Sequence, residues 1–142
     1  MKLKIIAIRK IKEKIYQKRI LEYIKWINKD IQSELIILKD RNEKNLEKNL
    51  KKYLYTGDSK ICISQEGIKY SSKQFSKLLF KENKDVSFFI GGPNGFPKIV
   101  RKSVKNIVSL SKLTMPHEMA LLVLSEQIFR AIEIKKGSKY HR

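Results

Sequence analysis

The chain has 142 residues, enough for one domain with a hydrophobic core of its own. Its 32 lysine and arginine side chains outnumber the 14 acidic ones, which gives a net charge of +18. This excess indicates a polyanionic partner, nucleic acid or an anionic membrane surface, although a lysine- and isoleucine-rich composition also raises the lysine count. The single cysteine, Cys62, excludes an intramolecular disulfide and a cysteine-based metal site.

Localisation and metal binding can be judged from what the pattern lacks. No secretory signal pattern precedes the first apolar segment, and no run approaches the ~20 apolar residues of a membrane span. Metal ligands do not cluster, and no Ser-His-Asp set stands out. We therefore expect a cytoplasmic protein without a membrane partner and without a metal.

Short apolar runs alternate with amphipathic stretches along the chain. Period and composition predict strands over residues 3–8, 34–38, 60–63, 86–90 and 106–110. They predict helices over residues 13–28, 39–54, about 72–82 and 116–134, with Gly57 closing the second and a loop over 64–67. This alternation predicts a single α/β domain over residues 1–142, with a mostly parallel sheet flanked by helices on both faces.

The last predicted helix is unusually apolar. Residues 120–124 read Ala-Leu-Leu-Val-Leu, so every side of this segment is hydrophobic. Such a helix must be covered on more than one face, and one sheet covers only one. A second copy of the chain in a homodimer is the economical cover, and a neighbouring helix of the same chain is the alternative.

Two segments follow predicted strands and could hold a ligand. Gly91-Gly92-Pro93-Asn94-Gly95 can adopt a positive φ or let a ligand approach the backbone closely, although a tight connection would need the same residues. It has neither Walker A nor GxGxxG spacing, which disfavours nucleoside triphosphate chemistry. Ser109–Thr114 has backbone N–H and C=O groups that an adenine ring could satisfy.

Candidate proton-transfer groups lie at two places. His117 falls at a helix N-terminus, where the dipole disfavours its charged form, so it could accept a proton or simply cap the helix. The basic tail over residues 135–142 ends in Tyr140-His141-Arg142, side chains that can stack on a base, move a proton and pair with phosphate. A disordered basic terminus is the alternative interpretation of the tail.

Four ordered motifs occur along the chain: residues 89–96 (FIGGPNGF), 109–117 (SLSKLTMPH), 126–131 (EQIFRA) and 140–142 (YHR). Together they resemble the RlmH family of the SPOUT class of RNA methyltransferases, over the whole chain. The resemblance implies a homodimer with a C-terminal trefoil knot, approximately residues 86–134. It also implies methylation of N3 of a pseudouridine in large-subunit ribosomal RNA, with S-adenosylmethionine as methyl donor.

The resemblance also implies roles for individual residues. The cofactor would contact Ile63, Gly91, Leu110, Ser111, Lys112, Leu113, Thr114 and Met115. The tail would reach the partner subunit's cofactor and the target base, with His141 as the candidate general base, Tyr140 and Arg142 as its support, and His117 as the alternative. Apart from the resemblance, we expect RNA to contact Arg130, Lys135, Lys136 and Lys139, although Arg130 could hold the tail instead of a phosphate.

Two other functions remain open at this point. A SPOUT methyltransferase acting on another RNA, such as transfer RNA, would share the cofactor and differ only in substrate. A small basic α/β dimer could also be a non-catalytic RNA-binding or ribosome-assembly factor. Whether free subunits or assembled ribosomes are the substrate also stays open.

Overall fold

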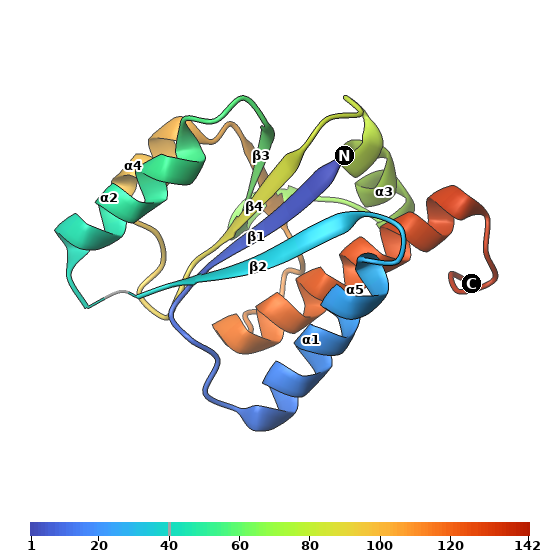
Figure 1. Cartoon of the computed structure of the whole chain (residues 1–142), viewed down its shortest axis with the longest axis horizontal. Helices are drawn as coiled ribbons and strands as arrows, with labels where there is room; N and C mark the ends of the chain where they lie inside the picture. The colour runs from blue at the N-terminus through green and yellow to red at the C-terminus, as the bar shows by residue number, and fades with distance from the viewer. Residues whose placement is uncertain (40) are drawn as a thin grey trace.

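The structure is a computed structural model that describes residues 1–39 and 41–142 (Figure 1). Strands and helices alternate along the whole chain, as the sequence predicts. In chain order they are β1 (Lys2–Ile8), α1 (Lys14–Ile27), β2 (Gln32–Leu38), α2 (Glu43–Leu54), β3 (Ser59–Lys69), α3 (Ser72–Phe80), β4 (Val86–Ile90), α4 (Lys98–Ser103), β5 (Asn106–Ser109) and α5 (His117–Lys136).

The strands form one sheet in the order β2-β1-β4-β3-β5, and every neighbouring pair is parallel. Parallel pairing brings the carboxyl ends of all the strands to one edge of the sheet. The segments that follow β4 and β5, although far apart in sequence from β3, therefore reach the same edge as β3. The predicted α/β class with a mostly parallel sheet is confirmed.

Alternation of side chains along the strands assigns the helices to the two faces. In β1, Leu3, Ile5 and Ala7 belong to a core with buried residues of α1, α3 and α5. Ile6 and Ile8 belong to a second core with buried residues of α2 and α4. Figure 1 shows α2 and α4 on one side of the sheet and α1 and α5 on the other.

The prediction of a loop over residues 64–67 is wrong, because β3 continues to Lys69. Its pairing with β5 shifts register between Ile63 and Ile68 and then resumes. Gly67 makes this close pairing possible: a Cβ there would lie 2.5 Å from the carbonyl carbon of Ile107. Ile63 pairs with Ile90, the last residue of β4, so the irregularity begins at the carboxyl edge of the sheet.

Two helix ends also differ from prediction. Helix α2 begins at Glu43 rather than at Lys39, and the side chain of Asn42 caps it by accepting hydrogen bonds from N–H groups of its first turn. Asp40, which falls inside the predicted helix, lies outside the described residues. Gly57 lies beyond the α2 cap residue Tyr55 and has no positive φ, so it does not close this helix. Gly137, with φ of 72°, closes α5. Lys135 and Lys136 therefore belong to the helix rather than to the tail.

Helix α5 packs on the sheet and contacts both α1 and α3. Its inner face consists of fully buried residues such as Leu124 and Ile128. Neighbouring helices of the same chain thus cover its flanks, which was the alternative to a second chain. The all-round apolar character of α5 does not by itself require a dimer, and the trefoil knot over residues 86–134 stays a prediction.

Candidate functional site

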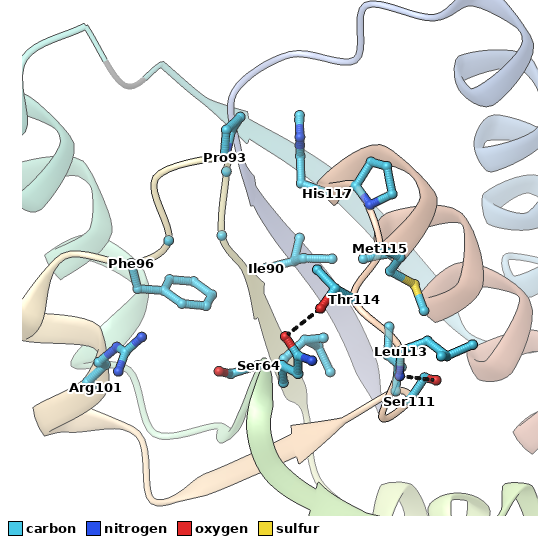
Figure 2. A pocket seen from close by; sticks show the side chains of 18 residues that line it. Ser64, Ile90, Pro93, Phe96, Arg101, Ser111, Leu113, Thr114, Met115 and His117 are labelled. Atoms are coloured by element: carbon cyan, nitrogen blue, oxygen red, sulfur yellow. Dashed lines mark hydrogen bonds between the residues drawn. The ribbon is translucent and has the colours of Figure 1, made fainter.

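A cavity of about 510 Å³ opens at the carboxyl edge of the sheet, where β4 and β5 end and β3 changes register (Figure 2). The chain leaving β3 leads to α3 on one face, and the chain leaving β4 leads to α4 on the other. Because these two neighbouring connections leave the sheet toward opposite faces, a crevice opens between them, and open α/β sheets bind ligands in such crevices.

The first wall is the glycine turn after β4. A Cβ on Gly91 would lie 3.0 Å from the carbonyl carbon and oxygen of Gly95, and one on Gly92 would lie 3.2 Å from the carbonyl oxygen of Ile8. Of the glycines in this turn only Gly95 has a positive φ, 77°, and its N–H donates to the carbonyl of Gly92. Gly91 and Gly92 are therefore needed for close packing of the backbone, not for left-handed geometry.

The second wall is the loop between β5 and α5. The hydroxyl of Ser111 accepts a hydrogen bond from the N–H of Leu113 at 3.0 Å. Gln65 of β3 fastens the same loop: its Nε2 donates to the carbonyl of Lys112 at 3.2 Å, and its Oε1 accepts from the hydroxyl of Thr114 at 3.2 Å. In Figure 2, Phe96 and Arg101 lie on one side of the cavity, and Leu113, Thr114 and Met115 lie on the other.

All but one of the residues predicted to bind a cofactor line this cavity. They are Ile63, Gly91, Leu110, Ser111, Leu113, Thr114 and Met115. Lys112 is the exception, and it contributes its backbone carbonyl to Gln65. His117, the alternative catalytic residue, also lines the cavity as the first residue of α5.

Four polar or aromatic residues of the lining were not predicted from the sequence: Ser64, Gln65, Phe96 and Arg101. Gln65 lies in the segment predicted as a loop, and Arg101 belongs to the short helix α4, which only the crossing between β4 and β5 brings to the cavity. A possible signal was the position of Gln65 directly after a buried strand, at the same edge as the glycine turn.

The cavity offers apolar surface, backbone groups and one permanent charge. Of the described residues that line it, Arg101 is the only one with a permanent charge, and none carries a carboxylate. Arg101 forms an ion pair with Glu66 at 3.1 Å, and both side chains are mostly exposed, so the pair is weak and Arg101 can exchange partners. Cys62 lies below in the core, where burial raises the pKa of its thiol to about 12 and leaves it neutral.

The tail residues gather at the other end of α5. Glu126 accepts from Arg130, with Oε1 2.7 Å from Nε and 2.6 Å from Nη2, and this hydrogen bond raises the pKa of Arg130. Arg130 Nη1 lies 3.0 Å from His141 Nδ1, and its guanidinium lies 4.8 Å from the ring of Tyr140. Burial, and next the Glu126 carboxylate, raise the pKa of Tyr140.

The contact between Arg130 and His141 fixes a tautomer. Arginine has no hydrogen-bond acceptor, so His141 Nδ1 must accept, and in the neutral ring the proton is on Nε2. In this position His141 presents an N–H donor. It can take up a proton on Nδ1 only after that atom leaves Arg130.

The predicted RNA contacts differ in their surroundings. Arg130 is paired with Glu126, and Lys136 is paired with Asp30. Lys135 lies 4.1 Å from the centroid of the Phe80 ring. Lys139 and Arg142 are exposed.

Within one chain the cavity and the tail cluster are separate. Ala120 lines the cavity and Arg130 contacts His141, and ten residues of helix, roughly 15 Å, lie between them. The structure thus brings His117 to the cavity but leaves Tyr140, His141 and Arg142 at the far end of α5.

Glu118 is a further residue of structural interest that the sequence analysis did not identify. It is 9% exposed, and its Oε1 accepts from the backbone N–H groups of Lys12 and Glu13 at 2.8 and 3.0 Å. A carboxylate from the first turn of α5 therefore satisfies orphan donors at the start of α1 and holds the two helices together beside the cavity.

No helix in the described part of the chain has both the length and the apolar content needed to span a bilayer. Among residues 1–39 and 41–142, no group of three or more histidine, cysteine or acidic side chains is placed to hold a metal ion.

Solved structures with the same fold are methyltransferases. A methylase family protein of Haemophilus influenzae superposes with a TM-score of 0.64 at 11% identity, covering 99% of this chain and 70% of that one. The SpoU methyltransferase AviRb of Streptomyces viridochromogenes, solved in complex with AdoMet, superposes with a TM-score of 0.52 at 9% identity, covering 96% and 62%. The chain therefore has the fold of these methyltransferases.

Sequence comparison narrows the class to a family. The family model described as predicted SPOUT methyltransferase matches residues 1–141. Proteins named ribosomal RNA large subunit methyltransferase H are 36% identical in Streptococcus uberis, over 100% of both chains, and 40% identical in Prochlorococcus marinus, over 99% and 96%. The chain belongs to this SPOUT methyltransferase family, and the resemblance inferred from the motifs is confirmed.

Proposed function

We propose that the protein is an S-adenosylmethionine-dependent methyltransferase that acts as a cytoplasmic homodimer on N3 of a pseudouridine in large-subunit ribosomal RNA. The observation that carries the proposal is full-length similarity to relatives named for methylation of this RNA, joined to a cavity built by the glycine turn after β4 and the loop after β5. The charge of +18 supports an RNA substrate.

The residues of the cavity fit this cofactor. A volume of about 510 Å³ is in the usual range for small-molecule sites, and the close-packed glycine turn leaves no side chain where the ligand would lie. Backbone groups of residues 110–115 would pair with the adenine, and Arg101 would pair with the carboxylate. When bound, S-adenosylmethionine supplies an electrophilic methyl group. The chain's own residues position it and exclude water.

The separation of the tail from the cavity supports a homodimer. A tail that acts at a cavity roughly 15 Å further along its own helix would have to leave its docking site, whereas a tail from a second subunit could arrive docked. Apolar side chains available for such an interface include Ile15 and Leu21 of α1, which are 82% and 50% exposed, and Met119 of α5. The tail of one subunit would then complete the cavity of the other.

The reaction requires loss of the proton on N3 of the target base. We assign this step to His141, with Tyr140 and Arg142 as support, and His117 at the cavity is the alternative. Because Arg130 occupies Nδ1 of His141, RNA binding would have to displace that contact before His141 accepts a proton. A general base of this kind contributes about 10²–10⁴-fold to the rate.

Calorimetric titration with S-adenosylmethionine tests the cofactor, and mass spectrometry of ribosomal RNA from a deletion strain tests the substrate. We expect saturable binding, loss of one methyl group from a pseudouridine, and its restoration by the purified protein. Assays on free large subunits, whole ribosomes and transfer RNA would separate the possible substrates. Absence of binding to folded protein, or an unchanged methylation pattern in the deletion strain, would refute the proposal.

A further inference from the structure

A second cavity, of about 440 Å³, lies between the C-terminal ends of α1 and α5 and the tail, at the end of α5 where Figure 1 places the C-terminus. Its aromatic lining consists of Trp26 from α1, Phe129 from α5 and Tyr140 from the tail. We call this cavity the aromatic groove. It is separate from the cavity at the glycine turn, and of the residues that line it only Tyr140 has a role in the proposed reaction.

The rings of the aromatic groove form a continuous cluster. Ring centroids lie 5.7 Å apart for Trp26 and Phe129, and 4.9 Å apart for Phe129 and Tyr140. Guanidinium groups stack against the two outer rings: Arg19 lies 5.9 Å from Trp26, and Arg130 lies 4.8 Å from Tyr140. These contacts hold the rings in place, and a cavity lined by fixed π-surfaces suits a flat, aromatic ligand.

The charge around the aromatic groove selects among flat ligands. Its two acidic side chains, Asp30 and Glu133, both pair with Lys136, at 3.2 and 3.6 Å. Residues 25–30 and 126–142 together contain seven lysine or arginine residues and three acids, the third being Glu126, which is paired with Arg130. The surplus is positive, so the surroundings attract phosphate and repel a cationic ligand or a lysine-rich peptide.

The same surplus disfavours a second copy of the chain as the occupant. In a two-fold interface centred on the aromatic groove, this positive surface would face itself, because an isologous contact joins the same patch on both subunits. A ligand with a flat aromatic group on a negatively charged backbone matches both the rings and the charge. Single-stranded RNA has that chemistry.

We propose that the aromatic groove binds an unpaired nucleobase of the RNA substrate by stacking, while the surrounding lysines hold the adjacent phosphates. The inference rests on the proposed function for the identity of the partner as RNA. Because Tyr140 is both a wall of the groove and the neighbour of His141, a base held there lies beside the residues assigned to the target base. The aromatic groove would therefore bind a nucleotide that flanks the methylated one.

Trp26 is the only tryptophan of the chain, so its fluorescence reports on the groove directly. The purified full-length protein is titrated with a short single-stranded oligoribonucleotide and with an abasic oligomer of equal length and charge. We expect saturable quenching of Trp26 by the first and none by the second, with affinities that differ roughly ten- to a hundredfold. Equal affinities with unchanged emission would overturn the proposal.

Variants separate stacking from charge. Trp26→Leu keeps apolar bulk but removes the stacking surface, and Tyr55→Ala removes an aromatic side chain that is 68% exposed on the opposite face of the sheet. With labelled oligomers, we expect Trp26→Leu to weaken the base-containing RNA about tenfold without affecting the abasic one. Tyr55→Ala should change neither. Circular dichroism and thermal melting show whether each variant is folded, and equal effects of the two variants would contradict the proposal.

Two further measurements separate RNA binding at the aromatic groove from self-association of the protein and from methyl transfer. Emission of Trp26 that shifts with protein concentration alone, without RNA, would show that a second copy covers the groove and would overturn the proposal. Methyl transfer to ribosomal RNA is measured separately with a radiolabelled donor. If transfer is absent but base-specific quenching persists, the proposed function fails and the groove stands. If transfer occurs without quenching, the groove fails alone.

Discussion

The two ends of α5 hold two differently built regions. At its N-terminal end, the cavity is formed largely by backbone and by small or apolar residues of three strand connections, with Arg101 as its one permanent charge. At its C-terminal end, the tail cluster is made of charged and aromatic side chains that contact one another. The first region is complete within one chain. The second has its reactive groups turned to its own helix, roughly 15 Å from the first.

This difference suggests a division of roles. A backbone-lined cavity binds one small molecule in a fixed position, because its hydrogen-bonding groups cannot change rotamer. A side-chain cluster on a tail can release its contacts and rearrange around a large partner. The comparison predicts that changes at the cavity affect cofactor binding, and that changes at the tail affect turnover.

The largest effect is expected from Gly91→Arg. Its Cβ would lie 3.0 Å from the backbone of Gly95, and its side chain would occupy the cavity, so calorimetry should show loss of S-adenosylmethionine binding by more than roughly a thousandfold. Gly57→Ala is the matched control, because no heavy atom of the described residues, apart from its chain neighbours, lies within 4 Å of its added Cβ. Binding retained by a folded Gly91→Arg protein would place the cofactor elsewhere.

Removal of Tyr140–Arg142 should lower turnover by about 10²–10⁴-fold, since it removes the assigned base, and should leave cofactor affinity unchanged. A mixture of this variant with Gly91→Arg sharpens the comparison. If the tail acts on the partner's cavity, mixed dimers contain one complete site and activity returns. If both variants and their mixture are equally inactive while mixed dimers form, action between subunits is excluded.

Gly67→Ala tests the irregular strand that forms the rim of the cavity. The added Cβ would lie 2.5 Å from the carbonyl carbon of Ile107, a backbone atom that no rotamer change can move, so we expect the free energy of unfolding to fall by about 3 kcal/mol. Urea denaturation, with Gly57→Ala for comparison, measures this. A variant as stable as the original protein would mean that β3 and β5 can separate at this position without loss.

Gln65→Ala should loosen the second wall without removing it. Two hydrogen bonds to the loop are lost, and because both are exposed we expect cofactor affinity to fall only about fivefold. Gln17→Ala, an exposed position on α1, controls for the loss of an amide side chain. An unchanged dissociation constant would indicate that the loop keeps its conformation without Gln65.

The smallest effect is expected far from both regions, at the amino-terminal end of β3. Burial raises the pKa of Asp58, but the hydrogen bonds that its carboxylate accepts from Ser87, Thr56 and Lys60 together outweigh burial and lower the pKa below its ordinary value of 3.8. A carboxylate with a lowered folded-state pKa contributes stability above its unfolded-state pKa and loses it as pH falls through the folded value. We expect Asp58→Asn to be less stable by about 1 kcal/mol at neutral pH.

The pH dependence provides the check on this assignment. Below pH 3.8 the stability of the original protein should decline more steeply than that of Asp58→Asn. Only the original protein has a carboxyl group at position 58 that takes up a proton on unfolding in this pH range. Parallel denaturation curves for the two proteins across this range would show that Asp58 is not responsible.

The sequence by itself determined the order of strands and helices along the chain and most of the predicted cofactor contacts that line the cavity. Apolar period gave the five strands and the four longer helices, and the segments after β4 and β5 contain most of the predicted cofactor contacts, because carboxyl ends of parallel strands share one edge. Local pattern could not show that β3 continues through Gly67, since that depends on pairing with β5 more than thirty residues later.

Only the tertiary structure decided which side chains meet across the fold. Gln65 reaches Thr114, Arg101 reaches Glu66, and Glu118 reaches the start of α1 because strand order and crossings place distant segments together. The separation of His141 from the cavity likewise follows from the length and direction of α5, which the family resemblance did not convey. Periodicity reports which face of an element is buried, but contacts between elements depend on packing that no single segment encodes.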